Sequence, residues 1–351
     1  MDKKLLVSLC FGALLLMGTV SSQTANAELK FSLKFGAGST ENDLKNPTSV
    51  LVSSNGKIIY VVDTGNNRIN LFKKDGTQSS KFGSSGSTDG LFQVPKGSVL
   101  DSLNGLLYVA DTGNNRIQVF DDSGKFKLKF GSSGSADGQL NSPIAVALDT
   151  TKDSLYVAET GNDRIQVFDH SGKFKLKFGS PGSVDGQLNS PEGLALDTTK
   201  DSLYVAETGN DRIQVFDHSG KFKLKFGSPG SVDGQLNSPE GLALDTTKDS
   251  LYVAETGNDR IQVFDHSGKF KLKFGSSGSA DGKFNSPSGL ALDSANNLLY
   301  VADTDNDRIQ VFKLVDTCPT GTTKIIDGVC FVEKFGSSGS ADGKFNSPSG
   351  L

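Results

Sequence analysis

Three histidines have the clearest capacity for chemistry, because an imidazole can bind a metal ion or transfer a proton near neutral pH. His170, His218 and His266 are the only histidines, and each occupies the same place in a unit that recurs with a period of 48. A zinc site needs ligands that converge on one ion. One position repeated in three units does not converge, so we expect these histidines to be solvent-exposed turn residues.

Six arginines form the second candidate set, and they recur with the same constant period. Each follows an acidic residue by five positions, as Arg68 follows Asp63. A β-hairpin can bring the two side chains together as a charge-assisted pair. Six such pairs would fasten the repeating units, or the guanidinium groups would form an anion-binding ring. The arginines are Arg68, Arg116, Arg164, Arg212, Arg260 and Arg308.

Two glutamates, Glu192 and Glu240, come closest to a unique acid on one unit. The other four units carry Thr48, Lys96, Ile144 and Ser288 at this position. An enzyme needs an asymmetric cluster of groups in tuned environments. Residues 179–226 and 227–274, however, are identical letter for letter. A catalytic residue placed there would exist in duplicate, so we predict no catalytic residue.

The elements that carry these residues follow from the repeat itself. The chain has 351 residues, 41 of them Gly and none of them Trp. A strict period of roughly 20 to 50 residues indicates a repeat architecture. Six tyrosines mark the units and are predicted to be structural: Tyr60, Tyr108, Tyr156, Tyr204, Tyr252 and Tyr300.

The repeating unit contains four short runs rich in Val, Ile, Leu, Tyr and Phe. In residues 191–226 these runs are 193–196, 203–206, 212–216 and 221–226, and polar turns separate them. Such runs and turns are typical of antiparallel strands, and no window shows a helical period. The sequence therefore predicts an all-β fold, a six-bladed β-propeller of four-stranded antiparallel blades.

The repeated strings resemble the NHL repeat, in its exported, prokaryotic type. They read Pro-x-Gly-Leu-Ala-Leu-Asp, then Leu-Tyr-Val-Ala-Glu, then Asn-Asp-Arg-Ile-Gln-Val-Phe-Asp, and they extend over residues 29–351. The resemblance implies a six-bladed propeller. Some lactonase-like propellers hold calcium in the central tunnel, but no set of acidic and amide side chains stands out here. We predict no cofactor, with calcium as the alternative.

Residues 1–27 have the pattern of a signal peptide. Lys3 and Lys4 precede an apolar run over 5–20, and Ala25-Asn26-Ala27 matches a cleavage site. An uncleaved anchor is the alternative. We expect a secreted or cell-surface chain without a membrane span after cleavage, in which Cys318 and Cys330 form a disulfide.

Domain boundaries follow the period. Blades are expected near 48–83, 96–131, 144–179, 192–227, 240–275 and 288–316, and 29–36 is expected to supply the outer strand of the sixth. An insertion breaks the period after the sixth unit, which leaves 330–335 as an alternative outer strand. Residues 317–334 would form a disulfide loop or linker. Residues 335–351 repeat 274–290 and would begin a further, truncated repeat.

We expect a binding or scaffold module that recognises a protein, peptide or glycan outside the cell. A net charge of −4 argues against nucleic acid as the partner. The alternative is a divalent-ion-dependent, lactonase-like hydrolase with its site in the tunnel. The predicted partner-binding face comprises Glu159, Asn162, Arg164, Glu192, Glu207, Asn210, Arg212, Glu240, Glu255, Asn258 and Arg260.

Overall fold

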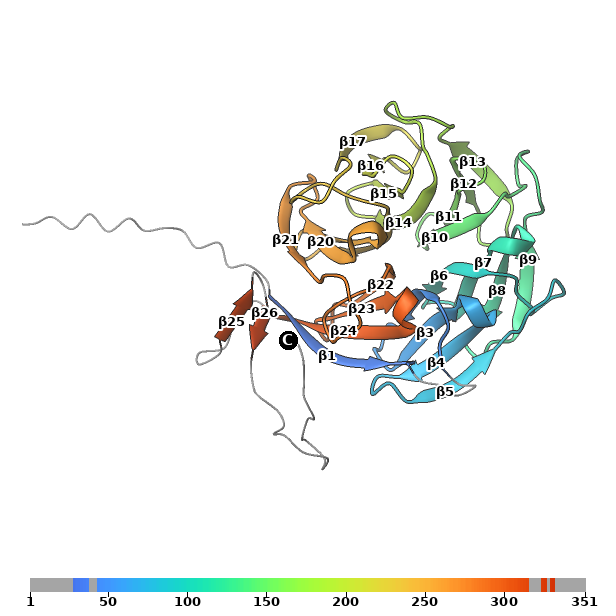
Figure 1. The fold of residues 1–351 in the computed structure, drawn as a ribbon. Coiled ribbons are helices and arrows are strands. Elements are labelled where there is room, and N and C mark those ends of the chain that lie inside the picture. Colours follow the sequence, from blue (N-terminus) through green and yellow to red (C-terminus); the bar gives the residue numbers. More distant parts are fainter. Residues whose placement is uncertain (1–27, 38–42, 316–322, 327–328, 332–351) are drawn as a thin grey trace, which may run out of the picture.

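Six four-stranded antiparallel sheets are arranged around a central axis (Figure 1). The structure is a computed structural model that describes residues 28–37, 43–315, 323–326 and 329–331. Within these ranges helix is confined to four single 3₁₀ turns: η1 (Thr64–Asn66), η2 (Thr112–Asn114), η3 (Thr256–Asn258) and η4 (Thr304–Asn306). The predicted all-β, six-bladed propeller is therefore confirmed.

Within a blade, the strands run outward from the axis in chain order. Blade 1 has β2 (Pro47–Val52), β3 (Ile58–Asp63), β4 (Arg68–Lys73) and β5 (Gln78–Phe82). Blade 2 has β6 (Pro95–Asp101), β7 (Leu106–Asp111), β8 (Arg116–Asp121) and β9 (Phe126–Phe130). Blade 3 has β10 (Pro143–Asp149), β11 (Ser154–Glu159), β12 (Arg164–Phe168) and β13 (Phe174–Phe178).

The next two blades repeat this arrangement. Blade 4 has β14 (Pro191–Asp197), β15 (Ser202–Glu207), β16 (Arg212–Phe216) and β17 (Phe222–Phe226). Blade 5 has β18 (Pro239–Asp245), β19 (Ser250–Glu255), β20 (Arg260–Phe264) and β21 (Phe270–Phe274).

The sixth blade joins the two ends of the ring. Its inner strands are β22 (Pro287–Asp293), β23 (Leu298–Asp303) and β24 (Arg308–Val315), and its outer strand is β1 (Glu28–Phe35). β1 pairs antiparallel with β24, with Glu28 opposite Val315 and Phe35 opposite Ile309. In Figure 1 the first strand, in blue, lies against the orange strands of this blade. Hydrogen bonds between strands, not a covalent bond, thus close the propeller.

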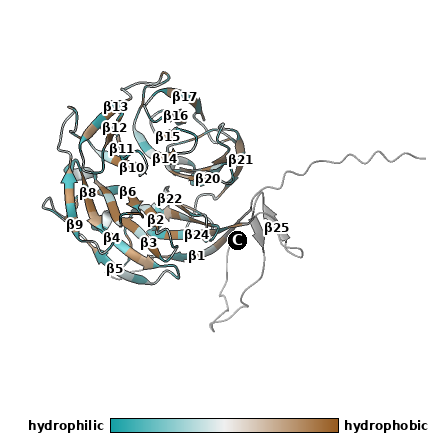
Figure 2. Ribbon diagram, turned by 180° about the vertical axis from the view of Figure 1, so that it is seen from behind, coloured by the Kyte–Doolittle hydropathy of each residue, from teal (hydrophilic) through white to brown (hydrophobic). Residues whose placement is uncertain are grey.

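The hydrophobic core lies between the blades, where neighbouring sheets pack face to face. Tyr204 and Val215 of blade 4, for example, share one cluster with Leu251 and Phe264 of blade 5. Figure 2 shows brown, hydrophobic stretches along the strands of the blades. Because each sheet buries both faces against its neighbours, the ring gains its stability from all six interfaces together.

Two asparagines and two aspartates make the turn that follows each 3₁₀ segment possible. Asn67, Asn115, Asp259 and Asp307 adopt φ of 52°, 52°, 50° and 55°, in the left-handed region. Asn and Asp tolerate this conformation better than other residues with a Cβ. The turn places the following arginine at the first position of the third strand.

The predicted signal peptide and the repeat at 335–351 lie outside the described residues. Cys318 also lies outside them, and only the backbone of Cys330 is described, so the disulfide stays a prediction. A two-stranded sheet of β25 (Thr323–Ile326) and β26 (Val329–Phe331) occupies part of the predicted linker, and β26 lies close to β1. No helix in the described ranges has the length and apolarity that a bilayer crossing requires.

Candidate functional site at the tunnel mouth

The propeller presents two faces, which are built from different turns. We call the face with the long segments between blades and the turns from second to third strand the top face. The bottom face carries the turns from first to second and from third to fourth strand. The predicted binding residues come from the top face, and the histidines come from the bottom face.

The predicted pairs of acid and arginine form in all six blades. In blade 4, Arg212 Nε donates to Glu207 Oε1 at 2.6 Å, and Glu207 has no exposed surface. The same carboxylate accepts hydrogen bonds from Asn210 Nδ2 at 2.6 Å and Gln214 Nε2 at 2.8 Å, and from the backbone N–H of Asn189 at 3.0 Å. A buried carboxylate with four donors is fully satisfied.

The guanidinium group also holds the long top segment onto its blade. Arg212 donates from Nη1 to the carbonyl of Ser183 at 2.5 Å and from Nη2 to the carbonyl of Gln187 at 3.0 Å. The corresponding arginine–acid pairs are Arg68–Asp63, Arg116–Asp111, Arg164–Glu159, Arg260–Glu255 and Arg308–Asp303. These pairs fasten the blades, and the arginine side chains, 4–11% exposed, are too buried to form an anion-binding ring.

Most of the predicted partner-binding face belongs to this network. Glu159, Glu207 and Glu255 are fully buried, and the side chains of their arginines are 8–9% exposed. The amides of Asn162, Asn210 and Asn258 donate to these same acids. Their polar atoms thus face their own blade. Of the predicted face, Glu192 and Glu240 line the cavity at the propeller axis.

That cavity is the central tunnel, about 430 Å³ in volume, lined by the first strands of all six blades. Glycine allows these strands to approach one another closely. A Cβ on Gly193 would collide with the carbonyl oxygen of Glu240, and one on Gly241 would collide with that of Ser288. Four blades have Gly at this position and the other two have Ser49 and Ala145, so large side chains do not fill the tunnel at this level. The residue before this position in each blade lies at the top opening of the tunnel.

We call the six residues at this opening the mouth ring. Hydrogen bonds link parts of it, since Thr48 Oγ1 donates to the carbonyl of Lys96 at 3.2 Å and Ser288 Oγ to that of Thr48 at 3.4 Å. In this ring Glu192 and Glu240 are neighbours, and Lys96 lies three blades from Glu240, across the tunnel. The ring comprises Thr48, Lys96, Ile144, Glu192, Glu240 and Ser288.

The two carboxyl groups of the mouth ring have pKa values above the ordinary value for glutamate. Burial, and then the neighbouring charge of Glu192, raise the pKa of Glu240 to about 7, against the opposing effects of Lys96 and Thr256. Burial also raises the pKa of Glu192, against Thr208 and Lys96. Neither glutamate forms a salt bridge within the described residues. Such a pair can hold a proton at neutral pH or bind a cationic group.

A resident divalent ion does not fit this ring. Calcium takes six to eight oxygen ligands, whereas the ring offers two carboxylates and places the ammonium group of Lys96 among the charges that act on them. Over the described part of the chain, no three His, Cys, Asp or Glu residues gather closely enough to hold a metal. We therefore derive no step that uses a bound metal.

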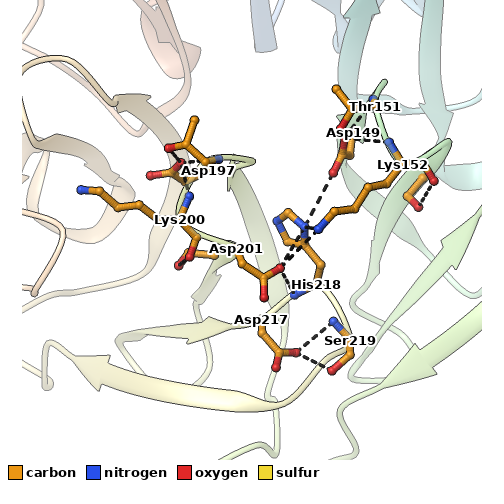
Figure 3. A network of polar contacts seen from close by, with 12 residues as sticks. Asp149, Thr151, Lys152, Asp197, Lys200, Asp201, Asp217, His218 and Ser219 are labelled. Carbon is orange, nitrogen blue, oxygen red and sulfur yellow. Dashed lines mark hydrogen bonds and ion pairs between the residues drawn. The ribbon is translucent and has the colours of Figure 1, made fainter.

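The histidines lie in bottom-face turns, but they are packed between blades, and the prediction of solvent exposure is wrong. The side chain of His218 is 6% exposed, and its ring lies 6.0 Å from that of Tyr156 in the preceding blade. Lys152 Nζ lies 2.5 Å from His218 Nδ1, and Asp201 Oδ1 lies 3.1 Å from the same nitrogen (Figure 3). His170 and His266 pack on Tyr108 and Tyr204 in the same manner.

The raised pKa of Glu240 predicts a pH effect on stability. Folded Glu240 keeps its proton up to about pH 7, whereas the unfolded chain loses it near the ordinary value of 4.5. The folded state then binds more protons than the unfolded state between these values, so stability falls as pH rises through that window. In Glu240→Gln we expect this loss, of the order of 3 kcal/mol, to disappear.

Urea unfolding of both proteins at pH 4 and pH 8 measures the difference. Asp122→Asn, which changes an exposed acid on the bottom face, serves as the control and should follow the wild type. Equal pH dependence in Glu240→Gln and wild type would contradict the raised pKa.

The sequence shows that the six residues of the mouth ring differ, but only the propeller structure shows that they surround one opening. The six aligned positions read Thr, Lys, Ile, Glu, Glu, Ser, and they vary even among the third to fifth units, which are otherwise nearly invariant. From the sequence alone the two glutamates carry little weight, and Lys96 does not stand out as a site residue. Its place across the tunnel from Glu240 follows from the six-fold geometry.

Comparisons with known proteins agree on the architecture. A family model described as "Lactonase, 7-bladed beta-propeller" matches residues 42–322. No curated protein matches the chain. The NHL type is not confirmed by these comparisons, and the described residues form six blades where the description of the family model has seven.

Several solved structures share the fold. A Bacteroides thetaiotaomicron protein of unknown function has a TM-score of 0.64 at 15% identity, covering 82% of this chain and 76% of that one. A streptogramin B lyase structure has 0.57 at 13%, covering 82% and 98%. Kuenenia stuttgartiensis hydrazine synthase has 0.55 at 12%, covering 78% and 97%. These identities show the fold alone, but the family model spans most of the sequence, and the chain belongs to the lactonase family of β-propellers.

Proposed function

We propose that the chain is an extracytoplasmic binding propeller that recognises a cationic group of a protein, peptide or glycan at the mouth ring, without catalysis. The observation that carries this proposal is the pair Glu192 and Glu240. They are neighbouring carboxyl groups that line the tunnel, and neither forms a salt bridge within the described residues. Two adjacent acids in a partly desolvated site favour an ammonium or guanidinium group.

The rest of the ring favours binding over reaction. Lys96, across the tunnel, can bind an acidic group on the same ligand, and the hydroxyl groups of Thr48 and Ser288 are engaged in hydrogen bonds within the protein. A rigid propeller that presents a few variable residues is a common basis for recognition. Export of the chain rests on the signal-peptide pattern of residues 1–27, and we further infer that its repeats are of the NHL type.

A hydrolase is the second candidate, and one observation favours it. With a pKa near 7, the carboxyl group of Glu240 can accept or donate a proton at neutral pH, as a general base or acid does. The family model bears the name lactonase, which describes other members of that family. The divalent-ion-dependent form of this alternative lacks a sufficient ligand set in the ring.

Binding of two cationic probes, trilysine and a chitosan oligomer, tests the proposal. Titration calorimetry at low ionic strength should detect at least one of them, and Glu192→Gln/Glu240→Gln should weaken binding by about tenfold or more. Asp122→Asn/Asp153→Asn removes two acids from the bottom face and should leave binding unchanged. Equal weakening by both double variants, or binding of neither probe, would contradict the proposal.

A second measurement separates the two candidates. Wild type is assayed for hydrolysis of γ- and δ-lactones at pH 7, with calcium and then with a chelator. Turnover that is lost in Glu240→Gln would favour the hydrolase and overturn a purely binding role. We expect no turnover in either condition.

A further inference from the structure

The bottom face carries a second cavity, at the junction of blades 1 and 6. It has a volume of about 540 Å³ and is lined by Asn55–Ile58, Lys73–Asp75 and Asn296. Three of these residues are lysines, Lys57, Lys73 and Lys74, and all three are exposed. We call this the lysine cavity. It lies on the face opposite the mouth ring and plays no part in the proposed function.

Comparison of the repeat positions shows that the positive charge is specific to this junction. Where blade 1 has Lys57, Lys73 and Lys74, blade 3 has Asp153, Asp169 and His170. Blades 4 and 5 have the same Asp, Asp and His as blade 3, and blade 2 has Gly105, Asp121 and Asp122. In blade 6 the same positions are Asn297, Lys313 and Leu314. The charge of these positions is thus reversed only where the ring closes.

The acids that the lysines replace have structural roles in the other blades. Asp169 Oδ1 accepts a hydrogen bond from the backbone N–H of Ser171 at 2.9 Å, and Asp153 Oδ1 accepts one from that of His170 at 2.8 Å. A lysine cannot accept such bonds. In blade 1 the outer turn is held instead by Asp75, whose Oδ1 accepts from the backbone N–H of Thr77 at 2.9 Å. The fold therefore does not call for lysine at these positions.

The three ammonium groups are also not held by hydrogen bonds or salt bridges in the part of the chain that the structure describes. Within the described residues, Lys57, Lys73 and Lys74 make no side-chain hydrogen bond or salt bridge, whereas lysines elsewhere on the rim pair with acids, as Lys177 does with Asp137 at 2.7 Å. Lys313 adds a fourth positive charge beside the cavity, because its Nζ donates to the carbonyl of Asn296 at 2.6 Å.

Few negative charges oppose this cluster. Asp75 is exposed, and hydrogen bonds from Thr77 together with the nearby Lys73 lower its pKa, so it stays ionised. Asp293 of blade 6 is 6% exposed and accepts a hydrogen bond from Asn296 Nδ2 at 2.7 Å. Both acids are thus engaged with protein groups, and the cluster keeps an excess of positive charge in a chain whose net charge is negative.

We propose that the lysine cavity binds a small oligoanion with clustered phosphate or sulfate groups. Lysine ammonium groups bind such oxyanions as point charges, each through a charge-assisted hydrogen bond. The volume of the cavity lies in the usual range for small-molecule sites. The amide of Asn55, exposed at the rim, adds a polar contact.

Titration with inorganic tripolyphosphate and with sucrose octasulfate tests this inference and distinguishes phosphate from sulfate. At low salt the wild type should bind one of them with a dissociation constant of about 1 mM or tighter, and binding should weaken as salt rises. Lys57→Gln/Lys73→Gln/Lys74→Gln should weaken binding by about tenfold or more.

The repeat offers a matched control, because Lys173, Lys221 and Lys269 are exposed lysines on bottom-face turns of blades 3, 4 and 5. Changing these three to Gln removes the same charge from the same face and should leave binding intact. Equal weakening by both triple variants, or binding of neither anion by the wild type, would overturn the inference.

Protection from acetylation provides a readout on the wild-type protein itself. Bound anion should slow acetylation of Lys57, Lys73 and Lys74, measured by mass spectrometry, and leave Lys173, Lys221 and Lys269 unaffected. Uniform protection of all six lysines would mean an ionic-strength effect and would also overturn the inference. Dimerisation of the wild type through the bottom face, with neither anion bound, would also overturn the inference.

Discussion

Replacement of Arg212 by leucine is expected to lower the free energy of unfolding by about 3–5 kcal/mol. The change leaves the fully buried carboxylate of Glu207 without its ionic partner and leaves the carbonyls of Ser183 and Gln187 without their donor. Removal of one member of a buried ion pair is among the most damaging single changes, because the remaining charge is desolvated and uncompensated. Urea denaturation followed by circular dichroism measures it.

Other blades of the chain supply the control for this experiment. Glu207→Asp keeps the charge, and Asp111 shows that a shorter acid can serve at this position. Asp111 accepts from Arg116 Nε at 2.7 Å, Asn114 Nδ2 at 2.9 Å and Gln118 Nε2 at 3.0 Å. We expect Glu207→Asp to cost about 1.5 kcal/mol or less. Similar losses in both variants would show that the charge pair is not what holds the blade together.

Removal of residues 28–37 is expected to abolish cooperative folding of the propeller. Without β1, the edge of β24 is unpaired, and Phe72 of blade 1 loses its contact with Phe35, whose ring lies 4.7 Å away. An exposed strand edge beside uncovered aromatic groups favours aggregation. Size-exclusion chromatography and thermal unfolding should show aggregates and no sharp transition.

A milder change tests the same contact. Phe35→Ala should cost about 3–5 kcal/mol, because Phe35 is buried in the core between blades 6 and 1. Ser32→Ala, at an exposed position of the same strand, should change stability by about 0.5 kcal/mol or less. Cooperative unfolding of the truncated chain at the wild-type temperature would show that β1 does not close the ring.

The architecture could be predicted well from the sequence because the same pattern of strand-like runs and polar turns recurs along the chain. Units two to five each show four strand-like runs, and the spacing of Arg212 from Glu207 fits a hairpin in which the two residues are directly paired. Local patterns of this kind determine what happens inside one blade. The acid–arginine pairs and the all-β fold could therefore be predicted from the amino-acid sequence alone.

Contacts between neighbouring blades could not be predicted from these local sequence patterns. His218 looks like an ordinary turn residue, and its burial depends on Tyr156, which belongs to the preceding blade and lies 62 residues earlier. The pKa of Glu240 depends likewise on Glu192 and on Lys96 across the tunnel. Such effects depend on how sheets face one another around an axis, and no single unit encodes that geometry.

The pairing of β1 with β24 in blade 6 also determines when the propeller can finish folding during synthesis. β1 is the first described strand to leave the ribosome, and its partner β24 is the last strand of the ring to do so. Until Val315 has been synthesised, the first strand has no place in the ring, and the loop that must be closed spans the whole propeller. Contacts of such high contact order form slowly. While the ring is being synthesised, β1 therefore remains unpaired, with Phe31 and Phe35 uncovered. The pairing of β1 with β24 closes the ring and at the same time covers this strand.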